Sequence, residues 1–356
     1  MNYGEPVGTS SPDAGSRPAH PTQADVAREA GVSRALVGIV FRNQPGASQE
    51  NRDYIRTVAA AIGYVPDQRA QLLSRKRTGI IGVSYSLTHD FHSTTVEHLY
   101  QSAEKIGLSL ILSGYGATRS EQSAVSNLLA YRCEGVVLVG SSCSTRDLEQ
   151  IAQQVPTVLI FRSMKRPGVG VVRTDDLAAS CTATEHLLGL GHRRLIHING
   201  ATAPGANERR KGFRQTVEHS DLIFEELRGG STDEDGLKAG RALADRMQRT
   251  GAARSPTAAV VFNDESAVGV IAAVRAAGIT VPDDLSVVGF DDSRLAGIPG
   301  VSLTTMRQDT AALAHHAIDQ LAARTHDHEL LATEVVIPAD LVLRSTTDVP
   351  PLAEAS

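Results

Sequence analysis

The stretch TQADVAREAGVSRALVGIVF, residues 22–41, decides how the N-terminal region folds. Thr22 stands three residues before Asp25, which is the spacing of a capping box, and apolar residues at helical spacing follow. Gly31 ends this predicted helix, and Ser33 can cap a second helix that fills the rest of the stretch. Two short helices joined by a glycine-containing turn predict a helix-turn-helix.

A third helix is expected from the cap Ser48 to Gly63, so that three small helices enclose a miniature core. In a helix-turn-helix the start of the second helix meets base edges in the DNA major groove, while the first helix crosses the backbone. The residues that fit these positions are Thr22, Ser33, Arg34, Ala35, Leu36 and Arg42. Each of them alone could be a helix cap or a solvated side chain, and only their joint arrangement favours DNA binding.

The chemistry of these side chains divides the expected contacts. Arg34 can pair with guanine through two hydrogen bonds, whereas Ala35 and Leu36 can make only apolar contacts, for instance with a thymine methyl group. Thr22 and Ser33 stand at helix N-termini, where backbone N–H groups favour phosphate oxygens.

Charge is divided unevenly along the chain. The formal net charge is −5, which taken whole argues against a nucleic-acid partner. Residues 21–77 hold nine basic and five acidic side chains, a net charge of +4, which leaves −9 for the remainder. Such asymmetry indicates a nucleic-acid-binding part attached to another domain, although on charge alone chance explains it equally well.

Three motifs carry a resemblance to a known family: DVAREAGVS at 25–33, GYVP at 63–66 and AQLL at 70–73. They are similar to the DNA-binding headpiece and hinge of the LacI family of bacterial transcription regulators. The resemblance implies that residues 67–78 form a hinge that becomes a helix on operator DNA. In that hinge Leu73 would be an apolar wedge in the minor groove, with Ala70 one turn before it.

The recognition helix departs from the family's pattern at one place. The family usually has Val-Ser-Arg-Val where this chain reads VGIV at 37–40. Ile39 thus replaces the family's base-reading arginine, and Gly38 weakens the helix by about 1 kcal/mol relative to alanine. We therefore expect base specificity to move to Arg34 and Arg42.

From Gly79 onward, short β-rich apolar runs alternate with helix-like stretches, as in IIGV at 80–83 and VVLV at 136–139. Such alternation predicts parallel sheets with helices on both faces. Residues 79–345 are too many for one such unit. We therefore expect two α/β lobes with a cleft between them, and such sheets bind ligands beyond the carboxyl ends of their strands.

The resemblance to the LacI family extends through this half. It rests, in order, on GHRR at 191–194, RRKGF at 209–213, NDESAVG at 263–269, VPDDLSVVGFDD at 281–292, LTT at 303–305 and LVLRS at 341–345. It covers residues 21–345 in all and implies a core domain akin to periplasmic sugar-binding proteins. Carried over residue by residue, the family's effector contacts fall on Arg209, Asn263 and Asp291, with Phe91 as a contact from the first lobe.

Each of these residues also has a plainer alternative. Arg209 offers a forked donor for hydroxyls or a carboxylate, or is an exposed helical arginine. Asp291 accepts from sugar hydroxyls or forms a turn after a buried strand, and Asn263 can both donate and accept. Phe91, in the run HDFH, stacks on a ligand ring or packs in the core. The chain has no tryptophan, so tryptophan platforms for a sugar are excluded and the effector stays open.

Motifs for catalysis are weak. The run GYGATR at 114–119 begins like a dinucleotide-binding fingerprint but has arginine in place of the third glycine. The three cysteines lack CxxC spacing, and the histidines near 315 and 326 lack the spacing of metal ligands. We therefore expect no enzymatic activity, no metal and no cofactor.

Residues 1–20, rich in glycine, serine and proline, are expected to be a disordered leader rather than a secretory signal, and residues 346–356 a flexible tail. No apolar run is long enough for a transmembrane helix. A two-lobed binding protein or enzyme without DNA function is the alternative, which the missing signal and the extra helix-turn-helix disfavour.

The sequence thus predicts an α/β protein in three parts: a three-helix headpiece (21–66), a hinge helix (67–78) and a two-lobed, periplasmic-binding-protein-like core of parallel sheets flanked by helices (79–345). The expected function is that of a cytoplasmic, homodimeric repressor. A small molecule between the lobes, a sugar or sugar derivative, would control its affinity for double-stranded operator DNA. The operator sequence and the choice between inducer and co-repressor stay open.

Overall fold

The computed structural model describes residues 21–65, 77–218, 222–327 and 329–351. The expected leader and the hinge positions Ala70 and Leu73 lie outside the described residues. The chain divides into two compact units, of which the second begins at Thr78. Within the described ranges no helix is long and apolar enough to cross a membrane.

The first unit is a three-helix domain. Its helices are α1 (Gln23–Ala30), α2 (Arg34–Phe41) and α3 (Gln49–Ala61). Thr22 and Asp25 form the predicted capping box. Gly31 ends α1 in the left-handed conformation, at φ 65°, and Ser33 caps α2 by accepting from the Leu36 N–H. The three helices enclose a small apolar core: Val26, Ala27, Ala30, Val37, Val40, Ile55, Ala59 and Tyr64.

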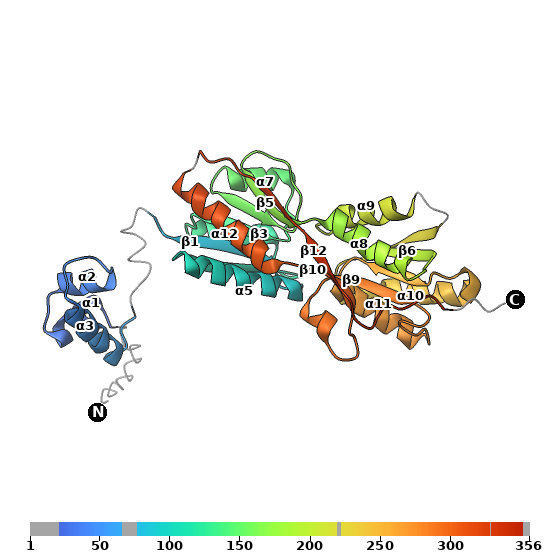
Figure 1. Cartoon of the computed structure of the whole chain (residues 1–356). Helices are drawn as coiled ribbons and strands as arrows, with labels where there is room; N and C mark the ends of the chain where they lie inside the picture. The colour runs from blue at the N-terminus through green and yellow to red at the C-terminus, as the bar shows by residue number, and fades with distance from the viewer. Residues whose placement is uncertain (1–20, 66–76, 219–221, 328, 352–356) are drawn as a thin grey trace, which may run out of the picture. The chain divides into compact units, whose positions relative to one another are not determined.

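The first lobe of the second unit is a parallel sheet in the order β11-β5-β4-β3-β1-β2, of which Figure 1 labels β1, β3 and β5. Its strands are β1 (Ile80–Ser86), β2 (Ser109–Tyr115), β3 (Gly135–Val139), β4 (Thr157–Ile160), β5 (Val169–Thr174) and β11 (Glu334–Ile337). One face packs on α5 (Asp90–Lys105) and α12 (Thr310–His326). The other is covered by α6 (Glu121–Ala130) and α7 (Thr145–Ala152). Because both faces are covered, the central strands are buried apolar runs.

The second lobe repeats this plan with the order β12-β10-β9-β8-β6-β7, in which β12 runs antiparallel to β10. Its strands are β6 (Arg194–Asn199), β7 (Ile223–Arg228), β8 (Ala258–Val261), β9 (Ser286–Asp291), β10 (Thr304–Gln308) and β12 (Ala339–Val342). One face packs on α8 (Asp176–Gly189) and α9 (Ala206–Val217), the other on α10 (Asp233–Thr250) and α11 (Asp264–Ala276). Two short 3-10 helices complete it: η1 (Ala252–Arg254) and η2 (Arg294–Gly297).

Close packing of α10 and α11 fixes where α11 begins. A Cβ at Gly236 would stand 2.0 Å from the Ser266 carbonyl oxygen, and one at Gly269 would stand 2.1 Å from the Asp233 carbonyl oxygen. Only glycine permits so close an approach of two helix backbones. The start of α11 is thereby held at the edge of the sheet.

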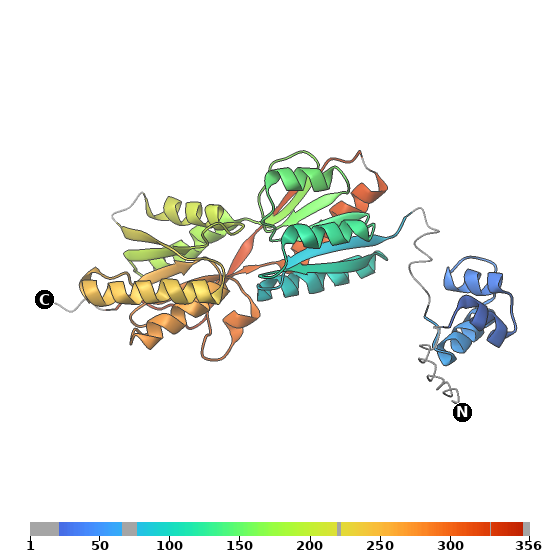
Figure 2. The ribbon, with the colours of Figure 1, turned by 180° about the vertical axis from the view of Figure 1, so that it is seen from behind.

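The two lobes are interleaved in sequence. The chain passes from the first to the second after β5, returns after β10, and crosses again between β11 and β12, as the crossing ribbons of Figure 2 show. The predicted α/β architecture, with a helical N-terminal domain and two parallel-dominated sheets, is confirmed.

Candidate functional site

The start of α2 presents an exposed surface in the first unit. Ser33, Arg34 and Ala35 are exposed, whereas Leu36 is half-buried and packs against the small core. Thr22 is also exposed, and its hydroxyl donates to Asp25 over 2.7 Å. The apolar side chain most available for an external contact is therefore Ala35 rather than Leu36.

The unusual glycine of α2 makes room for an arginine. A Cβ at Gly38 would stand 2.9 Å from Nη2 of Arg42, so the guanidinium lies over the place of the missing side chain. Ile39, by contrast, turns toward the loop, where its Cδ1 would be 3.7 Å from a Cβ at Gly46. Arg42 is thus the residue that fills the gap in the helix surface.

A cavity that is open at its mouth lies between the two lobes of the second unit; its empty space, including the solvent at the opening, is about 490 Å³. Its wall comes from residues at or after the ends of β1, β3 and β4 in the first lobe and of β6, β7, β8, β9 and β10 in the second. It is thus placed at the carboxyl ends of parallel strands, where such folds bind ligands. All four predicted effector contacts line it: Phe91, Arg209, Asn263 and Asp291. A wider outer hollow, of about 930 Å³ with the open solvent included, shares His89 and Ser231 with it.

Arg209 is a buried arginine of α9 and not an exposed helical one. Its Nε donates to Asp176 over 2.8 Å and its Nη1 to the Phe262 carbonyl oxygen over 2.7 Å. The guanidinium carbon lies 3.5 Å from the centre of the Phe290 ring, a cation–π contact. Burial raises the pKa of the Asp176 carboxyl, and the neighbouring Arg209 charge opposes that shift.

Asp291 ends β9 with its carboxylate at the cavity wall. Its backbone has φ 116°, a left-handed value that is strained for a residue with a side chain. Its Oδ1 accepts from Nε2 of Gln308 over 2.7 Å and lies 3.8 Å from Nη1 of Arg209. Burial raises the pKa of this carboxyl well above its usual range, and the negative charges of Asp264 and Glu265 add to the shift. Asp291 thus combines both roles expected of it: it forms the turn after a buried strand, and it lines the cavity.

Asn263 ties together two segments of the cavity wall, the start of α11 and the segment at Ser231. Its Oδ1 caps α11 by accepting from the Ser266 N–H over 2.9 Å, and its Nδ2 donates to the Ser231 carbonyl oxygen over 2.9 Å. Phe91 packs in the core of the first lobe, 5.3 Å from Phe161 between ring centres, and also lines the cavity.

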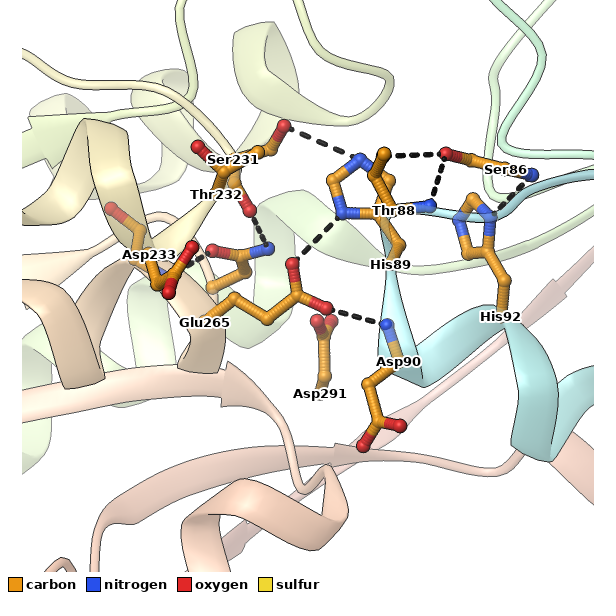
Figure 3. Close-up of polar contacts among 12 residues, drawn as sticks. Ser86, Thr88, His89, Asp90, His92, Ser231, Thr232, Asp233, Glu265 and Asp291 are labelled. Carbon is orange, nitrogen blue, oxygen red and sulfur yellow. Dashed lines mark hydrogen bonds and ion pairs between the residues drawn. The ribbon is translucent and has the colours of Figure 1, made fainter. Parts of the chain in front are cut away.

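A bridge between the lobes was not predicted from the sequence. Glu265, in the first turn of α11, accepts from the Asp90 N–H over 2.7 Å and lies 3.0 Å from Nδ1 of His89 (Figure 3). His89 is the N-cap residue of α5 and makes no side-chain cap of its own. A carboxylate of the second lobe therefore caps a helix of the first. The sequence offered one sign of this bridge: polar residues follow the strand before α5 and the strand before α11.

His92 also lines the cavity, and it was not predicted from the sequence as a site residue. It is 8 % exposed, and its Nδ1 accepts from the Ser86 N–H over 3.3 Å, as Figure 3 shows. Burial lowers the pKa of the ring to about 3, with a smaller contribution from His89. The ring is thus neutral, and because Nδ1 accepts, the proton resides on Nε2.

Comparisons with known proteins match both units. Residues 22–67 match the family described as bacterial regulatory proteins, lacI family, and residues 184–347 match a periplasmic binding protein-like domain. The regulator DegA of Bacillus subtilis is 30 % identical over 333 residues, which cover 91 % of this chain and 97 % of DegA. The chain belongs to the LacI family. It is a transcriptional regulator with a DNA-binding domain and a periplasmic-binding-protein-like domain.

Solved LacI-family structures share the fold over most of the chain. A LacI transcriptional regulator from a Rhodococcus species is 37 % identical, with a TM-score of 0.72, over 76 % of this chain and 99 % of that one. The lac repressor dimer bound to operator and the anti-inducer ONPF is 26 % identical, with a TM-score of 0.77, over 92 % of this chain and 99 % of that one. The relatives are regulators and not enzymes. Among the described residues no group of three His, Cys, Asp or Glu side chains could hold a metal ion.

Proposed function

We propose that this LacI-family chain acts as a homodimeric repressor whose operator affinity depends on a small polyhydroxylated molecule in the cavity between the lobes. The bridge from Glu265 to His89 and Asp90 carries the proposal. It is built into the wall of the cavity, so a molecule that enters must change the contacts that join the lobes. Binding in the cavity and the arrangement of the lobes are therefore linked.

On the DNA side we assign base reading to α2. Arg34 is exposed at its first turn and has the geometry for two hydrogen bonds to guanine, and Ala35 is the exposed apolar neighbour. Thr22 and Ser33 would meet phosphate at helix N-termini. Arg42 can swing from its place over Gly38 to a phosphate or a base. The hinge contacts of Ala70 and Leu73 rest on the family resemblance alone.

On the effector side we assign the cavity to a sugar or sugar derivative. Its wall combines buried polar groups, Arg209, Asn263 and Asp291, with the aromatic side chain of Phe91, a composition typical of small-molecule sites. A lac repressor structure with ONPG is 27 % identical to this chain over 92 % of it. That structure supports a small-molecule ligand for a chain of this fold.

The operator complex of the lac repressor dimer supports the same assembly here. We propose a headpiece over residues 21–66, a hinge over 67–78 and a core over 79–345. Two headpieces would then bind two halves of a pseudo-palindromic operator. By linkage, operator and effector must change each other's affinity by the same factor.

Fluorescence anisotropy on the chain's own upstream DNA tests the proposal. A competitor duplex of scrambled sequence gives the specificity ratio, and a salt series separates phosphate contacts from base contacts. We expect a sequence-selective complex whose affinity shifts when a sugar panel is added. A complex with no preference for the upstream sequence at any salt concentration would refute the DNA assignment. A selective complex that no compound of the panel alters would refute the effector assignment.

A further inference from the structure

We propose that the effector carries a positively charged amino group, which lies between the carboxylates of Glu265 and Asp291. The inference rests on the proposed function, because it takes the cavity between the lobes as the effector site. Three observations carry it: which hydrogen-bonding groups are already used, how charge is balanced around the cavity, and how the two carboxylates face each other.

Most neutral polar groups in the wall are already engaged. The Asn263 amide accepts from the Ser266 N–H through its oxygen and donates to the Ser231 carbonyl oxygen through its nitrogen. The Gln308 amide is used in the same way, because it accepts from the Thr174 hydroxyl and donates to Asp291. Each of these two amides keeps only one further N–H for a ligand, and the bonds that it already makes fix its position in the wall.

The carboxylates, in contrast, retain accepting capacity. An ionised carboxylate can accept about four hydrogen bonds. Glu265 accepts one from the Asp90 N–H and faces the His89 ring, and Asp291 accepts from Gln308. Both line the cavity, and Figure 3 shows the Asp291 carboxylate turned toward that of Glu265. The wall therefore needs donors from the ligand.

Positive charge is in short supply at the same place. The permanent cation in the cavity wall is Arg209, and its guanidinium is shared between Asp176, a buried carboxylate, and Asp291, whose Oδ1 lies 3.8 Å from Nη1. One positive charge therefore faces two carboxylates before Glu265 is counted. His92 is neutral because burial lowers its pKa to about 3. Burial is the main cause of the raised pKa of Asp291; Arg209 opposes the shift, and the negative charges of Asp264 and Glu265 add to it.

An ammonium group fits this inventory better than the alternatives. It brings three donors, no acceptor and one positive charge. A phosphate or carboxylate would add a negative charge beside two others, and a neutral hydroxyl would leave the repulsion between them in place. A metal ion would need a third ligand, and among the described residues no such group of three exists.

Isothermal titration calorimetry of the full-length protein at neutral pH tests the inference with matched probes. The pairs are D-glucosamine with D-glucose, D-galactosamine with D-galactose and D-mannosamine with D-mannose, and D-glucose 6-phosphate is the anionic probe. We expect the amino member of a pair to bind roughly tenfold or more tightly than its neutral partner, and the phosphate to bind least. The double variant Glu265→Gln, Asp291→Asn should abolish this preference.

The exposed Glu234→Gln variant, which removes one negative charge of the same lobe away from the cavity, should keep the preference. Thermal melting of each variant without ligand confirms that it is folded. Equal or tighter binding of the neutral sugars overturns the inference and leaves the effector cavity standing. A preference that survives the double variant overturns the placement of the amino group. Binding of none of the probes overturns the inference, and operator affinity that a wider sugar panel also leaves unchanged overturns the proposed function with it.

Discussion

Arg34 and Arg209 belong to two recognition regions that are built in opposite ways. Arg34 is exposed on the first turn of a short capped helix, and the neighbours that place it lie within a dozen residues of it. Arg209 is 6 % exposed, and its bonds go to Asp176 and to the Phe262 carbonyl oxygen, 33 and 53 residues away. The headpiece thus offers free donors to a partner, whereas the cavity uses its donors to hold itself together. Substitutions should therefore weaken binding in the first region and stability in the second.

The largest effect is expected at Arg209. Arg209→Ala leaves the buried Asp176 carboxylate without its partner, which costs about 3–5 kcal/mol of unfolding free energy. Urea unfolding followed by circular dichroism measures the loss. The neighbouring Arg210 is exposed and shares Glu226 with Arg214, so Arg210→Ala is the matched control and should change stability by less than about 0.5 kcal/mol. A loss below about 1 kcal/mol for Arg209→Ala would contradict its structural role.

The second-largest loss of stability is expected at the bridge between the lobes. Glu265→Ala removes the acceptor of the Asp90 N–H and the partner of the His89 ring, and we expect a loss of about 1.5–3 kcal/mol. Glu265→Gln keeps one acceptor oxygen for Asp90 and should lose less than half of that. Urea unfolding of both variants gives the comparison. Equal stability of the alanine variant and the wild type would show that the bridge contributes nothing.

The difference between the two regions also explains what the sequence could predict. In the headpiece, caps and the helix stop are local signals, so the capping box at Thr22 and the turn at Gly31 were predicted and are confirmed. In the core, apolar runs such as IIGV and VVLV predicted central strands β1 and β3. Strands β5, β7, β10, β11 and β12 were not predicted; of these, β7, β11 and β12 lie at sheet edges, where half-exposed strands lack long continuous apolar runs.

The cavity was predictable only in part for the same physical reason. Arg209, Asn263 and Asp291 could be named through the family resemblance, and the structure brings them to one wall. Apart from the cap bond between Asn263 and Ser266, the bonds that engage them join residues 17 to 53 positions apart, which no local pattern encodes. The bridge from Glu265 to His89 spans 176 residues and two lobes, so it follows from the interleaved topology alone. The assignment of these residues to an effector stays a prediction.

Removing Arg34 should weaken DNA recognition rather than stability, which is the opposite of the effect expected at Arg209. Arg34→Ala should cost about 1–3 kcal/mol of discrimination between the operator and a mismatched duplex, because a two-bond contact with guanine is lost. Its free energy of unfolding should change by less than about 0.5 kcal/mol, since the side chain is exposed. Anisotropy on matched duplexes and urea unfolding measure the two quantities. Arg56→Ala, exposed on α3, is the control. A loss of stability without a loss of discrimination would mean that Arg34, like Arg209, holds the fold together and does not read the DNA.

The most graded effect, and the smallest for each pH unit, concerns the neutral His92. Its pKa is about 3 in the folded protein against a usual 6.5, so the unfolded chain binds the extra proton as the pH falls between these values. Stability must then fall with decreasing pH, by up to about 1.4 kcal/mol per pH unit for this group. His92→Gln removes the titration and keeps an acceptor for the Ser86 N–H, so the stability difference between wild type and variant should shrink as the solution is acidified. The exposed His316→Gln is the control variant. A flat difference for His92→Gln would mean that the ring takes up a proton in the folded protein, and that the first lobe contributes a positive charge to the cavity after all.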